Sequence, residues 1–254
     1  MGEDRLKAVW KRYRAPVILG LIVLLAWELG CRFFPIRPSL LPAPTAVTRR
    51  FLEEYDLLWQ NLLPTLVQTG LGFLLSVVVG ILFGWVIVKS EIMNEALYPL
   101  IVILQVLPKE TLAPILILWF GAGALPRLLL AFLIAFFPMV INTVVGLRSV
   151  ERDIHRFARS LSCSPFQLFF KVEVPWALPF LFAGMKISVT LAVIGVVVSE
   201  LVAGRSGLGY LLLFASSKLD MAFTFAILAV LAAIGLLLFG GITLAERKLI
   251  YWKI

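Results

Sequence analysis

Charged residues are scarce in this sequence. Only 15% of its 254 residues are charged and 61% are hydrophobic, whereas a soluble domain is typically about a quarter charged. The hydrophobic residues gather in runs long enough to cross a bilayer, which takes about 20 helical residues. No stretch is both long and polar enough to form a separate soluble domain. We therefore expect an all-α, polytopic membrane protein with one membrane domain.

Residue types that hold metals or bind nucleotides are also rare. The chain has one histidine and two cysteines, without the spacing of a metal site. Cys31 and Cys163 are expected on opposite sides of the membrane, which argues against a disulfide. A phosphate-binding loop of the pattern Gly-x-x-x-x-Gly-Lys-[Ser/Thr] is missing, and no arrangement of Ser, His and acid suggests hydrolysis. We expect no catalytic site, no metal and no cofactor on this chain.

Six hydrophobic spans divide the chain. They lie at about 16–34, 63–88, 96–119, 125–147, 178–199 and 222–244. The first resembles a signal peptide but lacks a small-residue cleavage site, so we expect it to be retained. The organisation is then a cytoplasmic tail (1–15), the first span (16–34), a periplasmic or extracellular segment (35–61) with a short amphipathic helix at about 45–58, a five-span core (62–246) and a second cytoplasmic tail (247–254).

The positive charges indicate how the chain is oriented. The net charge is +8, which in a membrane protein indicates orientation rather than nucleic-acid binding. Fourteen of the 23 Lys and Arg residues fall on one side of the predicted spans and seven on the other. The excess places both termini and the loop 148–177 in the cytoplasm. We expect a multi-pass protein of the bacterial cytoplasmic (inner) membrane whose surroundings are lipid.

The loop 148–177 is basic and amphipathic. Four apolar residues fall on one face of a first helix, at positions i, i+3, i+4 and i+7: Ile154, Phe157, Ala158 and Leu161. After a break, Ser164-Pro165-Phe166-Gln167 predicts a second helix, because Ser and Gln in this spacing form a capping box and Pro suits the first turn. Two interpretations stay open: the helices rest on the bilayer surface, or their apolar face docks a soluble partner.

This loop resembles the "EAA" loop of importer-type ABC transporter permeases. Arg156-Phe157-Ala158 stands at the Glu-Ala-Ala position, Ser162 at the glycine, and Ala177-Leu178-Pro179 at the closing Leu-Pro. Segments elsewhere are similar to the same family, including Leu41-Pro42-Ala43-Pro44, Leu118-Trp119-Phe120-Gly121 and Ser206-Gly207-Leu208-Gly209-Tyr210. The resemblance covers about residues 40–250, and the nearest subgroup is the nitrate/sulfonate/taurine type.

The resemblance implies a type I ABC importer permease fold. It further implies a homodimer, two cytosolic ATPase subunits that bind ATP and Mg, and an external solute-binding protein. The expected solute is a small anion such as a sulfonate, taurine or nitrate; a pyrimidine or riboflavin-like compound is the alternative. An ion-gradient-driven transporter is more remote, since it would need internal repeats and an ion site near the midplane.

Eight loop residues are expected to couple the chain to the ATPase. They are Arg156, Phe157, Ala158, Leu161, Ser162, Ser164, Pro165 and Phe166. Two of them depart from the family pattern. Arg156 replaces an acid, and Ser162 replaces a glycine that permits positive φ, a region that serine tolerates poorly. We expect a bend of different shape, or a matching change on the partner.

Six polar residues in or near the spans are candidates for the translocation pathway: Lys109, Glu110, Lys186, Ser188, Thr190 and Glu200. Ionisable residues inside a span usually face a cavity or pair with one another. For Lys109 and Glu110 the alternatives are a structural pairing and a position near the membrane interface, and for Lys186 the alternative is snorkelling to the headgroups. Ser188 and Thr190 alternatively bond within the helices, and Glu200 lies either at a gate or at a solvated span end.

Overall fold

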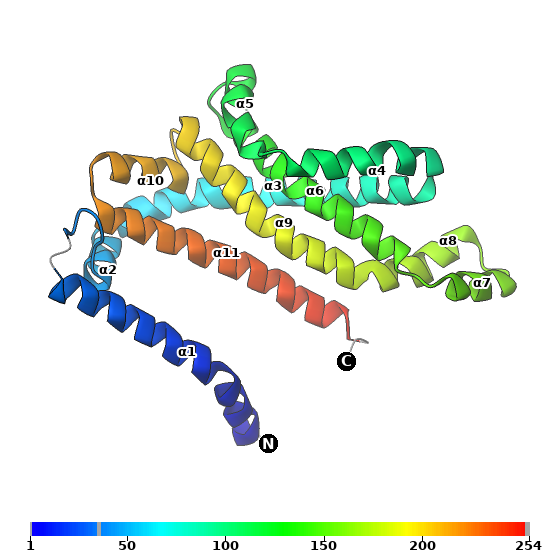
Figure 1. The fold of residues 1–254 in the computed structure, drawn as a ribbon, viewed down its shortest axis with the longest axis horizontal. Coiled ribbons are helices and arrows are strands. Elements are labelled where there is room, and N and C mark those ends of the chain that lie inside the picture. Colours follow the sequence, from blue (N-terminus) through cyan, green and yellow to red (C-terminus); the bar gives the residue numbers. More distant parts are fainter. Residues whose placement is uncertain (1, 35–36, 252–254) are drawn as a thin grey trace. The chain divides into compact units, whose positions relative to one another are not determined.

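The computed structural model describes residues 2–34 and 37–251, and these form helices without any strand. The helices are α1 (Gly2–Phe33), α2 (Pro44–Glu53), α3 (Tyr55–Lys89), α4 (Glu91–Val106), a 3-10 turn η1 (Lys109–Leu112), α5 (Ala113–Phe120), α6 (Ala124–Arg148), α7 (Arg152–Ser160), α8 (Pro165–Leu168), a π-turn η2 (Phe169–Glu173), α9 (Val174–Ala203), α10 (Leu208–Ser217) and α11 (Met221–Leu249) (Figure 1). The all-α expectation is confirmed.

The predicted spans correspond to long apolar helices. Five helices among the described residues are long and apolar enough to cross a membrane. The third predicted span, 96–119, is broken: α4 and the η1–α5 pair meet at 86°. The break falls at Pro108, because proline disfavours a helical conformation in the residue before it. Counted as one bent span, this pair gives six.

The chain divides into two compact units. The first contains residues up to 58 together with 212–229. There Glu28 of α1 accepts hydrogen bonds from the Thr45 backbone N–H (3.0 Å) and hydroxyl (2.9 Å) at the start of α2. Arg50 of α2 bonds Asp220 at 2.5 Å, and Asp220 caps α11 by accepting from the Phe223 N–H. The amphipathic helix expected at 45–58 ends at Glu53, because the chain turns at Glu54 before α3.

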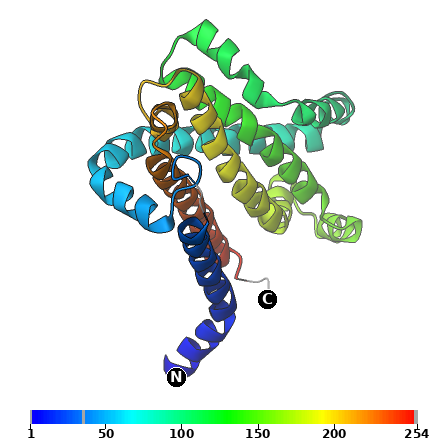
Figure 2. The same cartoon turned by 60° about the vertical axis from the view of Figure 1, so that its left-hand side comes forward.

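The second unit contains residues 59–211 and 230–254, and α6 with α9 forms its core. Figures 1 and 2 show these two helices lying against each other. Small residues make this close approach possible, as is common between membrane helices. A Cβ added to Gly195 of α9 would lie 2.7 Å from the Cα of Ala131. On α3, one added to Gly84 would lie 2.6 Å from the Thr143 side chain of α6.

Candidate functional site

The segment Arg152–Glu173, which we call the α7–α8 segment, joins α6 to α9. The predicted capping box is confirmed: the Gln167 N–H donates to the Ser164 hydroxyl (3.2 Å), and the Ser164 N–H donates to the Gln167 side chain (3.1 Å). Pro165 occupies the first position of α8, while its side chain lies outside the described part. The second helix therefore begins where its sequence predicts.

The bend between α7 and α8 keeps a conformation typical of glycine. Ser162 has φ = 56°, and the Cys163 N–H donates to the Ala158 carbonyl at 3.2 Å. This bond and the left-handed residue before it form a Schellman motif, a common end for a helix. Ser162 thus adopts the positive φ that glycine permits, because the hydrogen bonds that close α7 stabilise the left-handed conformation. A non-glycine residue pays roughly 1–2 kcal/mol for this conformation.

Large apolar side chains of the α7–α8 segment are exposed. Phe157 is 65% exposed, Leu161 66% and Phe166 71%, whereas Ala158 is buried. A cavity of about 280 Å³ is lined by residues from both helices: Ile154, Phe157, Ala158, Leu161, Cys163, Gln167, Lys171 and Val172. The four apolar residues predicted on one face of α7 thus share this cavity. Such a surface suits a partner that supplies complementary apolar groups.

Arg156 lies on a different part of α7. Its guanidinium is 3.4 Å from the Asp153 carboxylate, one helical turn away, and both side chains are largely exposed. An exposed ion pair of this kind contributes little to stability. The positive charge of Arg156 therefore remains accessible to a partner.

Lys109 stabilises the break between α4 and α5. Its ammonium group donates to the carbonyls of Gln105 (2.8 Å) and Leu107 (3.3 Å) and lies 4.7 Å from the centre of the Phe137 ring. These carbonyls lose their helical partners at the break, so the side chain replaces the missing donors. Lys109 also borders a cavity of about 210 Å³. Its neighbour Glu110 is exposed.

The other pathway candidates on α9 have partners within the protein. Lys186 forms an ion pair with Glu246 of α11. The buried Ser188 hydroxyl donates to the Ala135 carbonyl of α6 at 2.8 Å, and the Thr190 hydroxyl donates to the carbonyl of Ile187 in its own helix. None of these three side chains forms a hydrogen bond or ion pair with Lys109.

Glu200 lies at the centre of a buried polar cluster. Its side chain is fully buried, and it accepts hydrogen bonds from the Thr65 hydroxyl (3.0 Å) and the Gly209 N–H (2.8 Å). The Arg127 guanidinium is 3.8 Å away. The expectation of a solvated span end is wrong, because the chain after α9 folds back and covers the carboxylate. Gly207 has φ = 103°, and a Cβ added to it would overlap the carboxylate of Glu200.

Comparison with known proteins identifies the family. The model for the binding-protein-dependent transport system inner membrane component matches residues 76–251. The chain belongs to this family.

The relatives are permeases of ABC importers. The chain is 38% identical to the riboflavin transport system permease protein RibX of Chloroflexus aurantiacus, covering 96% of this chain and 91% of that protein. It is 34% identical to the formylaminopyrimidine transport permease protein ThiX of Halalkalibacterium halodurans, covering 94% and 95%. It is 30% identical to the taurine transport system permease protein TauC of Escherichia coli, covering 99% and 95%.

A solved structure has the same fold. The inward-facing methionine ABC transporter MetNI superposes with a TM-score of 0.67 at 17% identity, covering 78% of this chain and 98% of that chain. The predicted type I ABC importer permease fold is confirmed. This protein is accordingly a multi-pass inner-membrane transport subunit, and the family implies ATPase and binding-protein partners.

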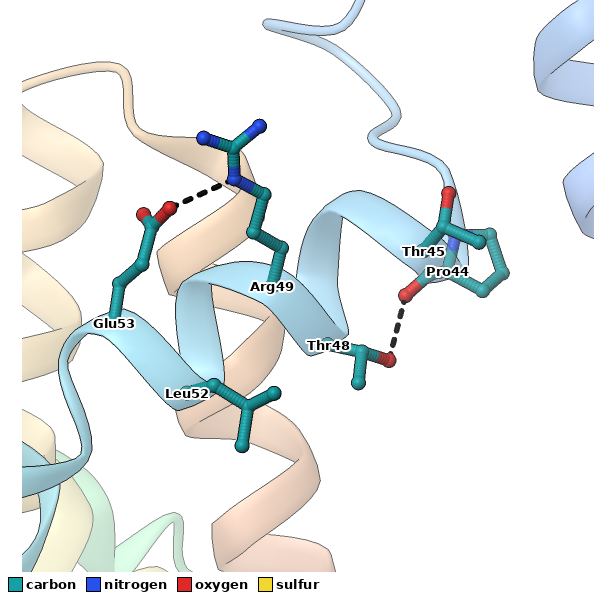
Figure 3. Close-up of a pocket in the computed structure, with 6 residues that line it drawn as sticks. All are labelled: Pro44, Thr45, Thr48, Arg49, Leu52 and Glu53. Carbon is teal, nitrogen blue, oxygen red and sulfur yellow. Dashed lines mark hydrogen bonds and ion pairs between the residues drawn. The ribbon is translucent and has the colours of Figure 1, made fainter.

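The permease has another surface hollow, on α2. A cavity of about 590 Å³ is lined by Pro44, Thr45, Thr48, Arg49, Leu52 and Glu53 (Figure 3). Its polar groups already have partners: Thr48 donates to the Pro44 carbonyl, Arg49 donates to Glu53, and Thr45 donates to Glu28 of α1. The hydrogen bond from Arg49 lowers the pKa of Glu53 below its ordinary value. The sequence and the geometry together indicate no ligand chemistry here.

Sequence reasoning missed the partners of the buried charges. Glu200 lies close to Arg127 and accepts a hydrogen bond from Thr65, and the buried carboxylate of Glu173 forms an ion pair with Lys89. A usable signal was present, since an acid within an apolar span requires a partner of opposite charge or several donors. Only the fold, however, shows which of the candidate partners lies close enough.

Proposed function

We propose that this permease pairs with a second copy of itself to form the translocation pathway of an ATP-driven importer. The α7–α8 segment is the docking surface for a cytosolic ATPase subunit. The observation that carries the proposal is the exposure of Phe157, Leu161 and Phe166 on a segment whose backbone is otherwise fixed by caps and bends. Removing such side chains from water on docking supplies roughly 25 cal/mol per Å² of apolar surface.

The orientation follows from the charges. Lys and Arg are twice as frequent on the side that carries both termini and the α7–α8 segment, which supports a cytoplasmic location for all three. ATP and Mg bind the partner subunits, because this chain has no phosphate-binding loop. Closure of the ATPase dimer moves the α7–α8 segment, and the spans exchange inward and outward access to a solute delivered by the external binding protein. Such a cycle requires the two nucleotide states to differ in their fit to this segment.

Replacing Leu161 and Phe166 by Asp tests the docking surface. Two charges in the apolar contact should abolish co-purification of the ATPase subunit, because a carboxylate is costly to bury without a partner. Elution of the permease as a folded, monodisperse complex in detergent checks that the pore remains intact. The matched control places Asp at Leu219, which is similarly exposed at 71% but lies outside the segment. Retention of the ATPase by the double variant would contradict the docking role.

The solute is either a small anion or a heterocyclic compound. A taurine permease is among the relatives, which supports a small solute that carries a sulfonate group. Two observations favour a riboflavin- or pyrimidine-like solute. The identities to the riboflavin and formylaminopyrimidine permeases are higher than the identity to the taurine permease. Lys186 is paired with Glu246, so its charge is less available to neutralise an anionic solute. Stabilisation of the cognate binding protein in a thermal-shift screen of riboflavin, pyrimidines, taurine and nitrate distinguishes the two.

A further inference from the structure

A chain of aromatic contacts runs from the exposed α7–α8 surface to α3. Phe166, at the surface, lies 4.4 Å from Phe170 between ring centres, and Phe170 lies 5.0 Å from Phe169. Phe169 in turn meets Trp85 of α3 edge-on at 6.1 Å. The two longer separations fall within about 4.5–7 Å, the range in which aromatic rings attract one another, and the first lies at its lower edge. A displacement of Phe166 is therefore resisted at α3 as well as along the backbone.

An ion pair reinforces the last contact. The Lys89 ammonium group, at the end of α3, lies 3.0 Å and 3.2 Å from the two carboxylate oxygens of Glu173 and 5.7 Å from the centre of the Phe169 ring. Glu173 is only 6% exposed, whereas the side chain of Lys89 is 42% exposed, so the carboxylate is the buried member of the pair. Because a buried carboxylate without its partner is strongly unfavourable, the pair keeps α3 and the end of the α7–α8 segment together when either moves.

The backbone holds both contact residues on the same side. Phe169 and Glu173 are the first and last residues of the π-turn η2, where the Val174 N–H donates to the Phe169 carbonyl five residues earlier. Short π-turns within helices occur frequently at functional sites. This turn lies where the α7–α8 segment enters α9, so one short element contacts α3 and continues covalently into α9.

We propose that Lys89 and Glu173, together with Phe169, are positioning residues that transmit movement of the α7–α8 segment to α3, in parallel with its covalent connection to α9. The inference rests on the proposed function, in which an ATPase moves that segment. It divides the coupling into two routes: the backbone moves α9, and the Lys89–Glu173 pair moves α3. A network of this kind is established only when its disruption separates the responses of two elements.

The test uses the full complex of two permeases and two ATPase subunits, with Cys31 and Cys163 replaced by Ser. Spin labels at exposed positions Leu82 of α3 or Ile187 of α9 report distances between the two copies. In the parent complex, trapping with vanadate and Mg-ATP should shift both distances. In Lys89→Met the Leu82 shift should be lost and the Ile187 shift retained. The charge swap Lys89→Glu with Glu173→Lys should restore the Leu82 shift.

Several outcomes would overturn the inference. One is an unchanged Leu82 shift in Lys89→Met; another is an equal loss at both labels, which indicates that the pair only maintains the fold. If Lys89→Met does not fold, Phe169→Leu serves instead, with the same expected loss at Leu82 alone. Arg49→Met on α2 removes a cation elsewhere and should leave both shifts in place. Failure of the parent permease to retain its ATPase contradicts the proposed function itself, which is a different result.

Discussion

The two ends of α9 differ in which side chains are buried and which are exposed. At its C-terminal end the polar groups are enclosed: Glu200 is fully buried and bonded to Thr65, Gly209 and Arg127. In the α7–α8 segment that precedes its N-terminal end, large apolar groups are exposed: Leu161 is 66% exposed and Phe166 71%. Buried carboxylates at both ends are paired within the chain, Glu200 with Arg127 and Glu173 with Lys89, whereas the large apolar side chains that precede α9 are exposed.

This difference separates structural charges from docking surfaces. A buried carboxylate with several internal donors contributes to the folded state, and its removal is costly wherever it lies. An exposed phenylalanine contributes little to the stability of the isolated chain, and it contributes to the free energy of binding when a partner covers it. Substitutions at the C-terminal end should therefore change stability first, whereas substitutions at the N-terminal end should change assembly first.

The largest expected effect is at Glu200. Glu200→Ala leaves the Arg127 guanidinium, whose side chain is 10% exposed, without its carboxylate. Breaking a buried ion pair from one side costs about 3–5 kcal/mol, and the permease should unfold at a clearly lower temperature when followed by tryptophan fluorescence in detergent. Glu95→Gln, on an exposed part of α4, is the control. A thermal midpoint equal to that of the control would show that the cluster is not structural.

A smaller loss is expected at Gly207. Its φ of 103° is unfavourable for other residues, and an added Cβ would overlap the Glu200 carboxylate. Gly207→Ala should lower the free energy of unfolding by roughly 1–3 kcal/mol, the usual cost of such backbone strain. Gly123→Ala is matched, because Gly123 has φ of −158° and open space at its Cβ. Similar denaturation curves for the two variants would contradict the close approach to Glu200.

Much of the fold follows from the sequence by simple periodicity. Long apolar runs bounded by charges are enough to predict the helices, and Ser164 with Gln167 predicts the start of α8. The sequence Pro108-Lys109-Glu110 interrupts the apolar run 96–119, and the helix breaks at this point. Local signals of this kind need no knowledge of distant neighbours.

The environment of the charged residues did not follow from the sequence. Whether Glu200 is solvated depends on residues 204–209 folding back over it, and whether Lys186 is free depends on Glu246, 60 residues away. Local composition is the same in either case. Ser162 shows the converse: its residue type argues against a positive φ, yet the Schellman bond to Ala158 overrides that preference.

The smallest expected effect sharpens the comparison at the N-terminal end. Ser162→Gly removes a left-handed penalty of roughly 1–2 kcal/mol and adds about 0.5–1 kcal/mol of backbone entropy cost. The α7–α8 segment should become slightly more stable, with slower amide hydrogen exchange at Cys163, while the thermal midpoint of the whole chain stays unchanged. Ser160→Gly, in the last turn of α7, should speed exchange in the same segment, because glycine is unfavourable in a helix. Faster exchange in both variants would mean that Ser162 is not strained, and that the bend depends on its side chain rather than on the helix end that surrounds it.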